Sequence, residues 1–498
     1  MATTIGRGID VPYGHRDQFF IGGQWVDPSS SDRFDLVSPI SEEYYASVAE
    51  ARESDMNRAV AAARDAFDRG PWPRLGHAER ATFLNAIGRA VSERSGDIAR
   101  IWPNETGVLQ SVAALAGNAV GDTFHYYAGL AETFPFEEQH KPLAGGHTGL
   151  LTREPVGVVA AIIPWNHPLA LIANKIAPAL LAGCTVVIKA SPEAPGMAYL
   201  MAEIAEAVSL PAGVLNIITA DRDVSEALVR HPGIDKIAFT GSTAAGRRIA
   251  ALCGDRITRY TLELGGKSAA VILDDYDVEA AAQAIAQPAC FLSGQVCSSL
   301  TRIIVPRQKH DRLVEALGAS FGAMRVGDPF ETSSDLGPVA MRRQRDRIEQ
   351  LIAQGKEEGA VLAAGGGRPT HLNRGFFIEP TVFGNVRNDF AIAREEIFGP
   401  VLSVIPVDSE AEAIETANDT IYGLNNSVFT NDPDRAYRVA RRLLSGTVGH
   451  NVWRTDFSIA FGGFKQSGVG REGGTEGLLP YLETKTIVLE GRPSHIAG

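Results

Sequence analysis

The sequence contains little cysteine and no pattern typical of a metal site. Its four cysteines, Cys184, Cys253, Cys290 and Cys297, include no CxxC pair, so neither a disulfide framework nor a structural zinc site is indicated. The 11 histidines include no HExxH or other paired ligand spacing. We therefore expect reduced thiols and no bound metal ion.

Long apolar runs are missing as well. No stretch approaches the roughly 18 uninterrupted apolar residues that suggest a transmembrane helix, and residues 1–10 lack the apolar core of a secretory signal. The net charge is -12, whereas nucleic-acid phosphates are bound by clustered Lys and Arg. We expect a cytoplasmic protein that binds neither membranes nor nucleic acid.

What is present is the composition of a globular protein, with 45% hydrophobic and 21% charged residues. The length of 498 residues exceeds one ordinary core and suggests two or three domains. Residues 20–26 have the pattern of a strand or hairpin. Apolar residues then recur at helical spacing in residues 56–67 and 83–91.

From residue 156 onwards, short apolar runs alternate with segments of helical length. This alternation predicts parallel strands joined by crossover helices. A second α/β series begins near residue 268 and implies a second domain. The predicted strands of the two series are residues 158–163, 185–188, 214–218 and 236–239, followed by residues 269–273, 301–305, 401–407, 427–430 and 447–451.

Cys297 is the strongest candidate for a chemically active residue. It lies between a helix-like run and the strand-like residues 302–305, and such junctions place side chains in clefts. The alternative is that it packs as a small hydrophobe, as free cysteines commonly do. That alternative suits the other three cysteines, which lie in apolar patterns, better than Cys297, whose flanks are Gly, Gln and Ser.

Two further polar residues lie in or after apolar runs. Glu263 belongs to an apolar strand pattern that ends at Gly265 and Gly266, and Asn166 follows a predicted strand within the run Pro-Trp-Asn-His-Pro. A carboxylate whose pKa is raised by apolar walls can act as a general base, and a side-chain amide can stabilise an oxyanion. The alternatives are a carboxylate satisfied by the glycine amides and an asparagine that favours a turn.

The stretches around Glu263 and Cys297 together resemble the general-base and nucleophile signatures of the NAD(P)-dependent aldehyde dehydrogenase superfamily, and the resemblance extends from about Phe20 to Ile487. It implies an α/β fold with two Rossmann-like, doubly wound domains and a small β arm. The implied boundaries are residues 1–132 and 155–262 for the NAD(P)-binding domain, 263–479 for the catalytic domain, and 133–154 and 480–498 for the oligomerisation element.

The oligomerisation element also has a signature of its own. Residues 133–154 are punctuated by Gly and Pro and have no helical period. The resemblance makes this segment a protruding hairpin that pairs with the C-terminal tail, from Pro480, of a neighbouring subunit. We therefore expect a homodimer or a homotetramer.

The resemblance assigns roles to three catalytic residues. Cys297 is the nucleophile, Glu263 is the general base, and Asn166 holds the oxyanion together with the backbone amide of Cys297. An unperturbed thiol is only a few per cent thiolate near neutral pH. We therefore also expect some local activation of Cys297.

The cofactor residues that the resemblance implies are Ile163, Pro164, Trp165, Lys189, Ser191, Gly241, Ser242, Leu264, Glu396 and Phe398. Gly241 and Ser242 open a helix whose N-terminal amides can face a diphosphate, although the usual GxGxxG fingerprint is absent. NAD-preferring members often have Glu three residues after the lysine, but this chain has Pro192 there and Glu193 one place later. We expect NAD as the cofactor, with moderate discrimination, and leave NADP open.

The resemblance places the following residues near the aldehyde entrance: His167, Ala170, Asn174, Phe291, Trp453, Phe457 and Phe461. Most are apolar or aromatic, and the nearby charged exception is Arg454. Because Asn174 stands where some relatives carry a tryptophan, we expect a wide tunnel and a medium-sized apolar aldehyde, which is aliphatic, aromatic or terpenoid. The alternative is that the aromatic rings pack against one another and leave a narrow entrance.

The predicted reaction is the NAD(P)-dependent oxidation of an aldehyde to its carboxylic acid. Cys297 forms a thiohemiacetal, hydride passes to the nicotinamide, and Glu263 activates the water that hydrolyses the thioester. The alternatives are a coenzyme A-acylating semialdehyde dehydrogenase, a cysteine hydrolase and a non-catalytic protein on the same fold. Glu263 argues against the first, the nucleotide turn against the second, and the complete catalytic set against the third.

Overall fold

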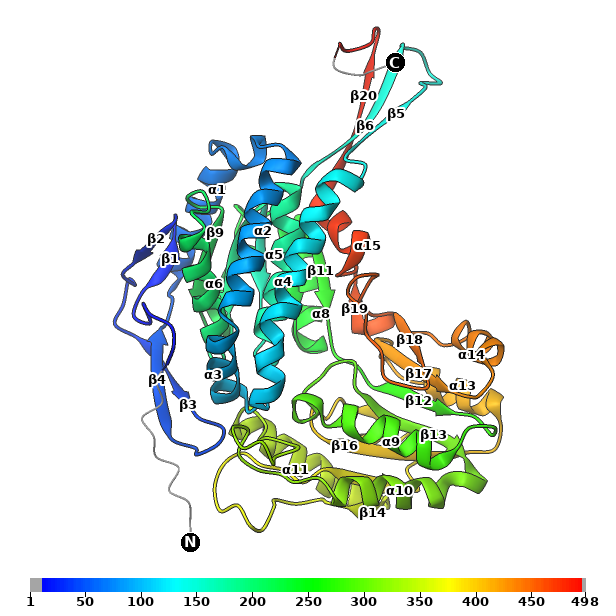
Figure 1. The fold of residues 1–498 in the computed structure, drawn as a ribbon. Coiled ribbons are helices and arrows are strands. Elements are labelled where there is room, and N and C mark those ends of the chain that lie inside the picture. The colour runs from blue at the N-terminus through cyan, green and yellow to red at the C-terminus, as the bar shows by residue number, and fades with distance from the viewer. Residues whose placement is uncertain (1–10, 495–498) are drawn as a thin grey trace.

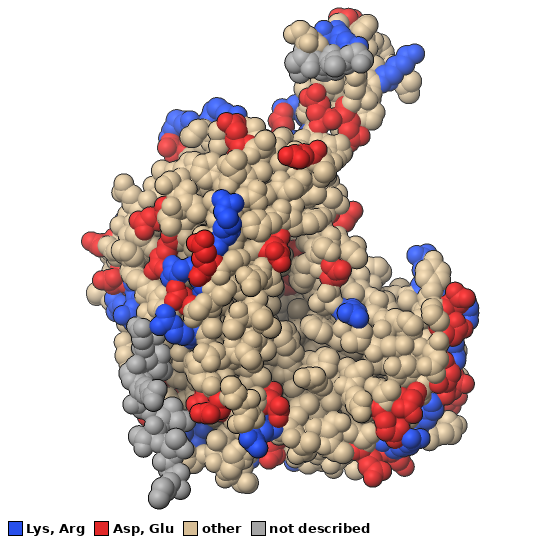
Figure 2. Space-filling model, in the orientation of Figure 1, with Lys and Arg blue, Asp and Glu red and all other residues tan. Residues whose placement is uncertain are grey.

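The computed structural model describes residues 11–494 as two α/β lobes with a projecting arm (Figure 1). Acidic and basic side chains are interspersed over the face shown in Figure 2, and much of that face is uncharged. Among the helices of residues 11–494, none has both the length and the apolar character needed to cross a membrane.

The first lobe is built on a sheet of order β19-β11-β10-β7-β8-β9-β1-β2, whose central strands, β11 to β9, are parallel. From β7 the chain runs through β8 to β9 and then returns to β10 on the other side of β7. The strand order therefore reverses between β7 and β10, which is where open α/β sheets bind ligands. The strands are β1 (Phe19–Ile21), β2 (Gln24–Val26), β7 (Val158–Ile162), β8 (Thr185–Ala190), β9 (Leu215–Thr219), β10 (Lys236–Thr240), β11 (Arg259–Glu263) and β19 (Gly468–Val469).

Helices cover both faces of this sheet, which explains why β7 and β8 are buried along their whole length. One apolar core includes residues of α2 to α6, and a second core, on the other face, includes residues of α1, α7 and α8. The helices are α1 (Glu53–Asp68), α2 (His77–Glu93), α3 (Ser95–Thr106), α4 (Gln110–Thr133), α5 (Pro168–Ala182), α6 (Gly196–Ala207), α7 (Arg222–Arg230) and α8 (Thr243–Arg256). A separate ribbon pairs β3 (Arg33–Val37) with β4 (Tyr44–Ala49).

The second lobe has a sheet of order β14-β15-β16-β13-β12-β17-β18, parallel except for β14. Two apolar cores again lie on its faces. The strands are β12 (Ser268–Ile272), β13 (Leu300–Pro306), β14 (Val361–Ala364), β15 (Thr381–Gly384), β16 (Val401–Val407), β17 (Asn425–Phe429) and β18 (Thr447–His450). The helices are α9 (Val278–Ala289), α10 (His310–Gly322), α11 (Arg342–Glu357), α12 (Ala391–Arg394), α13 (Glu410–Asn418) and α14 (Pro433–Ala440).

Two parallel-sheet lobes confirm the fold class predicted from the sequence, and each predicted strand is present with ends shifted by no more than two residues. The ribbon β3–β4 and the antiparallel pair β14–β15 had no counterpart among the predicted strands. The domain boundaries remain a proposal. Near its end the chain returns to the first lobe, where β19 pairs with β11, before α15 (Gly474–Leu478) leads towards the arm.

The arm is a sheet of order β20-β6-β5 that stands clear of both lobes (Figure 1). Its strands are β5 (Glu137–His140), β6 (Thr148–Pro155) and β20 (Leu482–Leu489). The predicted hairpin is present, but its predicted pairing with the tail of a neighbouring subunit is wrong. The tail pairs within its own chain, because β20 pairs with β6 along its whole length, from Leu482 opposite Pro155 to Leu489 opposite Thr148.

Candidate active site

A left-handed turn presents Cys297 to the space between the lobes. The turn follows α9, and Leu292, Ser293 and Gly294 have φ angles of 49°, 57° and 73°. Each non-glycine residue in this region costs about 1 kcal/mol, so the surrounding contacts must hold the turn. Gln295 does so, because its side-chain amide donates to the carbonyl of Leu292 at 3.0 Å and accepts from the Ala340 amide at 2.9 Å.

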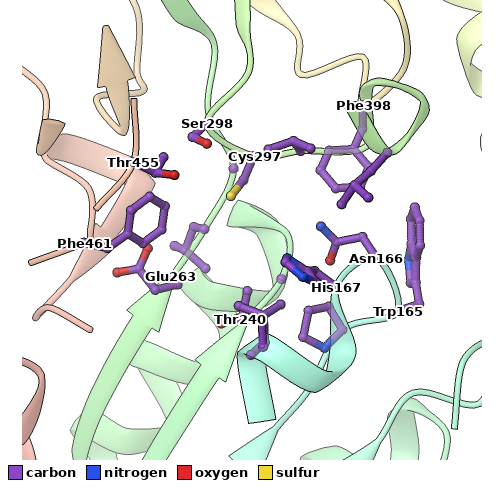
Figure 3. A pocket seen from close by; sticks show the side chains of 18 of the residues that line it. Trp165, Asn166, His167, Thr240, Glu263, Cys297, Ser298, Phe398, Thr455 and Phe461 are labelled. Carbon is purple, nitrogen blue, oxygen red and sulfur yellow. The ribbon is translucent and has the colours of Figure 1, made fainter. Parts of the chain in front are cut away.

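A cavity of about 930 Å³ lies next to this turn, at the carboxyl ends of β7 and β10. Its volume is near the upper end of ordinary ligand sites. The cavity brings together most of the residues predicted for the site, namely Pro164, Trp165, Asn166, His167, Ala170, Asn174, Gly241, Ser242, Glu263, Leu264, Phe291, Cys297, Glu396, Phe398, Trp453, Phe457 and Phe461. Figure 3 shows the Cys297 sulfur between Glu263 and Asn166. The predicted residues Ile163, Lys189 and Ser191 lie outside its lining.

Asn166 is held at the turn by two hydrogen bonds. Its Nδ2 donates to the carbonyl of Gln295 at 3.0 Å, and its own carbonyl accepts from Trp102 Nε1 at 3.1 Å. A side-chain amide carries two N–H donors, so one remains for an oxygen that develops negative charge beside Cys297. This placement fits the oxyanion role and is more specific than a turn preference requires.

Glu263 is a buried carboxylate whose oxygens are available for a ligand. It is the last residue of β11, and among residues 11–494 neither of its carboxylate oxygens has a hydrogen-bond partner. Burial raises its pKa well above the ordinary value, and Glu472 raises it further, while Lys175 and Arg471 oppose the shift. The predicted alternative, a carboxylate satisfied by the glycine amides, is wrong because the Gly266 amide donates to Glu396 instead.

A buried ion pair behind Glu263 was absent from the predicted site. Lys175 on α5 pairs with Glu472, and both side chains are almost completely buried. Lys175 Nζ also donates to Thr240 Oγ1 at 2.6 Å. Lys175 and Glu472 are 297 residues apart in the sequence, so only the folded chain brings them together. The negative charge of Glu472 raises the pKa of Glu263, and the positive charge of Lys175 lowers it.

The expected local activation of Cys297 does not come from a lowered pKa of the thiol in this structure. Burial raises the pKa of the thiol, and the carboxylates of Glu396 and Glu263 raise it further. Both effects disfavour the thiolate. The thiol therefore requires a base to accept its proton when it attacks.

Glu396 is a second carboxylate beside Cys297, and it is half-buried and anchored. Its Oε1 accepts from the Gly266 amide at 3.0 Å. Burial raises its pKa to about 7, despite this hydrogen bond. Gly265 and Gly266 allow Glu396 and the Cys297 backbone to approach this segment closely. A Cβ at Gly265 would collide with the Glu396 carboxylate, and one at Gly266 with the carbonyl of Cys297.

The cofactor end of the cavity has the features that a dinucleotide requires. Ser242 is the N-cap of α8, and its Oγ accepts from the Ala245 amide at 3.3 Å. The N-terminal amides of this helix face the switch point between β7 and β10 and suit a diphosphate. Across the cleft, Trp165 and Phe398 meet edge to face with their ring centres 5.4 Å apart. The residues present therefore fit NAD.

Lys189 and Ser191 lie at the end of β8, next to the switch strand β7, and Ile163 follows β7 directly. Burial lowers the pKa of Lys189 to about 8, and its Nζ donates to the Ala220 carbonyl at 3.4 Å. These residues border the carboxyl end of the sheet, where the rest of a dinucleotide extends in doubly wound folds.

Aromatic rings line the other end of the cavity in two pairs. Phe457 and Phe461 stack with centres 4.4 Å apart, and Phe291 and Trp453 are tilted at 6.0 Å. The cavity is also lined by small or aliphatic side chains that were not predicted, mainly from α4, namely Ala116, Ala119, Val120, Thr123 and Leu171. Small residues on a helix face give no sequence signal for such a role.

Polar groups are sparse at this aromatic end. The Asn174 side chain is 5% exposed, and its Oδ1 finds no hydrogen-bond partner within the described chain. Arg454 is exposed and lies outside the cavity lining. His167 stacks on Trp102 with ring centres 4.6 Å apart, and burial lowers its pKa to about 4. The imidazole is therefore neutral near pH 7.

The fold and the cavity define a doubly wound α/β enzyme with a thiol in the cleft at the switch point of its first sheet. Residues 25–487 match the model of the aldehyde dehydrogenase family, and the chain belongs to that family.

Similar proteins cover nearly the whole chain. Geranial dehydrogenase of Castellaniella defragrans is 45% identical over 473 residues, which are 95% of this chain and 98% of that protein. The 3-succinoylsemialdehyde-pyridine dehydrogenase of a Pseudomonas species is 40% identical over 476 residues, with 95% and 98% coverage.

Solved structures agree in fold. The Mycobacterium tuberculosis aldehyde dehydrogenase complexed with NAD+ has a TM-score of 0.93 and 42% identity, covering 97% of this chain and 99% of that one. A mutant of aldehyde dehydrogenase C from Pseudomonas syringae, complexed with NAD+ and octanal, has a TM-score of 0.93 and 38% identity, with the same coverage.

Proposed function

We propose that this enzyme oxidises a medium-sized apolar aldehyde to its carboxylic acid with NAD as the cofactor. One observation carries the proposal: Cys297, Asn166 and Glu263, whose carboxylate has no hydrogen-bond partner within residues 11–494, meet in a single cavity at the switch point of a doubly wound sheet. Relatives in complex with NAD+ support the cofactor. The cytoplasmic location remains a prediction from the sequence.

The residues of the chain divide the reaction into two stages. The Cys297 sulfur adds to the carbonyl carbon as its proton leaves to a base, and the Asn166 amide donates to the resulting oxyanion. Bound nicotinamide supplies the hydride acceptor, which leaves an acyl group on Cys297 as a thioester. Glu263 then removes a proton from water, the water oxygen bonds to the acyl carbon, and the carbon–sulfur bond breaks. The carboxylic acid leaves and the thiol is restored.

The two rival activities differ from aldehyde oxidation in the residues that they need. A cysteine hydrolase needs a histidine base for its thiol, and a coenzyme A-acylating enzyme needs no Glu263. A cysteine hydrolase requires a histidine to activate its thiol, but within residues 11–494 no histidine is hydrogen-bonded to Cys297. His167, the histidine in the cavity lining, is stacked on Trp102 instead. A coenzyme A-acylating enzyme transfers its acyl group to a thiol and needs no base for water. The free, buried carboxylate of Glu263 favours hydrolysis.

The aromatic end of the cavity supports an apolar substrate. The aromatic rings pack in pairs, as in the alternative that predicted a narrow entrance. The cavity beside them is nevertheless large, because α4 contributes small side chains to its lining. Arg454, which could bind a distal carboxylate, lies outside the lining. Similarity to a geranial dehydrogenase and to a structure that holds octanal points the same way.

For a substrate series, we expect kcat/KM to rise from acetaldehyde to hexanal and octanal. Burying a methylene contributes about 0.8 kcal/mol, which is roughly fourfold in kcat/KM for each early methylene. The measurement is NADH absorbance with these aldehydes, benzaldehyde and succinic semialdehyde. A best rate on the semialdehyde would overturn the apolar assignment.

The variant Asn174→Trp tests whether the series reports this cavity. A tryptophan at this lining position fills space in the cavity, so octanal should lose far more kcat/KM than acetaldehyde does. Asn174→Leu is the matched control, because it keeps the branching and the number of heavy atoms of the side chain and replaces the amide. If Asn174→Trp lowers kcat/KM equally for both aldehydes, the long chain binds elsewhere.

A homo-oligomer is also part of the proposal, since the arm leaves apolar side chains uncovered. Val488 on β20 is 53% exposed and Leu143 is fully exposed, and such projecting apolar surface favours association. Light scattering should therefore give a multiple of 53.2 kDa. Val488→Asp should shift the mass towards one chain, whereas Val361→Asp, at an equally exposed site on β14, should not. A parent protein of one-chain mass would contradict the proposal.

A further inference from the structure

The wall of the cavity that α5 provides contains a buried amide. His167, Ala170, Leu171 and Asn174 all line the cavity, and their spacing places them along one side of the helix. This side begins at His167, which Figure 3 shows beside Asn166. Because seven helical residues span about 10 Å, Asn174 lies farther along the wall and meets a part of the substrate away from the reacting carbonyl.

The Asn174 amide is not satisfied by the protein. Its Oδ1 has no hydrogen-bond partner among residues 11–494, although a buried acceptor without a partner destabilises the fold. An asparagine inside a helix usually turns its amide to solvent or to a hydrogen-bonding neighbour, but only 5% of Asn174 is exposed. Packing alone would therefore favour an apolar residue here. Such exceptions are expected where a side chain serves a ligand.

The wall around this amide is uncharged. Burial lowers the pKa of His167 to about 4, so its ring is neutral near pH 7, and Ala170 and Leu171 are apolar. An ammonium or carboxylate group would lose its hydration here without gaining an ion-pair partner from this wall. A hydroxyl is neutral and can donate a hydrogen bond to Oδ1. Pockets for mainly apolar ligands commonly use a few such polar groups to orient them.

We infer that the enzyme acts on an apolar aldehyde that also carries one hydroxyl group, and that Asn174 Oδ1 binds this hydroxyl. The inference rests on the proposed aldehyde oxidation and narrows its substrate class. The small size of Asn174 predicted a wide tunnel, whereas its oxygen, unpartnered within the described chain, adds a preference for a hydrogen-bond donor. The simpler alternative is that a water molecule satisfies the amide and that Asn174 only leaves room.

Matched pairs of substrates test this hydrogen bond. Each pair is an unbranched alkanal and the ω-hydroxy aldehyde of the same length, with six, eight or ten carbons, and the measurement is kcat/KM from NADH absorbance. At one length the hydroxy aldehyde should exceed its alkanal by at least about tenfold, because a site that hydrogen-bonds a hydroxyl discriminates strongly against the analogue without it. At the other lengths the hydroxyl should lower kcat/KM, since it is buried without a partner.

Asn174→Leu removes the acceptor and keeps the branching and the number of heavy atoms of the side chain. In this variant the ratio of kcat/KM for the preferred hydroxy aldehyde to that for its alkanal should fall at least about tenfold. Thermal unfolding should occur at or above the parent temperature, because the unsatisfied amide is gone. Thr123→Val is the matched control. Thr123 lines the same cavity, but its hydroxyl donates to the Ala119 carbonyl at 3.4 Å, so the ratio should stay unchanged.

The parent protein alone can overturn the inference. If the hydroxy aldehyde is no better than its alkanal at every length, Asn174 does not select a hydroxyl, whether or not the variant folds, and oxidation of the alkanals still supports the proposed function. A preference that survives in a folded Asn174→Leu protein would place the hydroxyl elsewhere and would also overturn the inference. A parent protein that oxidises none of these aldehydes would refute the proposed function together with it.

Discussion

The variant Cys297→Ala is expected to lose aldehyde oxidation by at least about a thousandfold, because no covalent bond to the carbonyl carbon can form. NADH binding should be nearly unchanged, since the thiol forms the acyl bond and does not hold the dinucleotide. The measurement pairs NADH production from octanal with a fluorescence titration of NADH. Turnover that survives in this variant would refute the covalent mechanism.

Cys290→Ala is the matched control for that variant. Cys290 is seven positions earlier in the chain, is buried in an apolar core of the second lobe and lies outside the cavity lining. Its loss should leave kcat close to that of the parent protein. A similar collapse in both variants would mean that thiol removal damages the fold rather than the reaction.

The variant Glu263→Gln is expected to form the acyl enzyme and then stall. An amide cannot accept the proton of water, so hydrolysis of the thioester should slow by about 100-fold to 10,000-fold. A stopped-flow trace should show a burst of about one NADH per active site, followed by slow turnover. Steady turnover at the parent rate would show that another group activates the water.

The pH dependence gives an independent check on the same residue. Burial raises the pKa of Glu263, so its base form is lost as the pH falls through a range above that of an ordinary carboxyl group. In the parent protein kcat should therefore fall on acidification at unusually high pH for a carboxylate. Glu263→Gln should lack this limb of the profile.

Glu396→Gln separates the roles of the two carboxylates beside Cys297. Glu396 is anchored by the Gly266 amide, which suits a group that positions the cofactor rather than one that meets water. Its loss should slow the burst itself and leave hydrolysis no longer limiting. A normal burst with a slow steady phase would reverse the roles of Glu396 and Glu263.

The core of the site could be predicted from sequence because each member lies in a short, local pattern. The motifs around Cys297, Glu263 and Asn166 are short and resemble those of the aldehyde dehydrogenase family, and the structure brings all three residues to one cavity. The same reasoning gave the parallel strands of both lobes, since buried strands are continuous apolar runs. At these positions, the local sequence pattern is therefore enough to predict where the residue lies in the fold.

Contacts between distant segments could not be predicted in this way. The ion pair of Lys175 with Glu472 spans 297 residues, and that of Glu193 with Arg343 spans 150. The pKa of the Cys297 thiol is raised first by burial between the lobes and then by carboxylates on β11 and on the segment after α12. The partner of the hairpin was wrongly predicted for a related reason: local pattern shows that β6 needs a strand beside it, but not which chain supplies it.

In the proposed homo-oligomer, the arm also sets when subunits can assemble. A ribosome releases β5 and β6 long before β20, since 333 residues separate Thr152 from Lys485. Until β20 emerges, β6 pairs only with the four residues of β5, and a lone two-stranded hairpin is marginally stable in water. If the proposed homo-oligomer forms through the arm, its association therefore follows synthesis of nearly the whole chain, because nascent chains on neighbouring ribosomes present no complete arm.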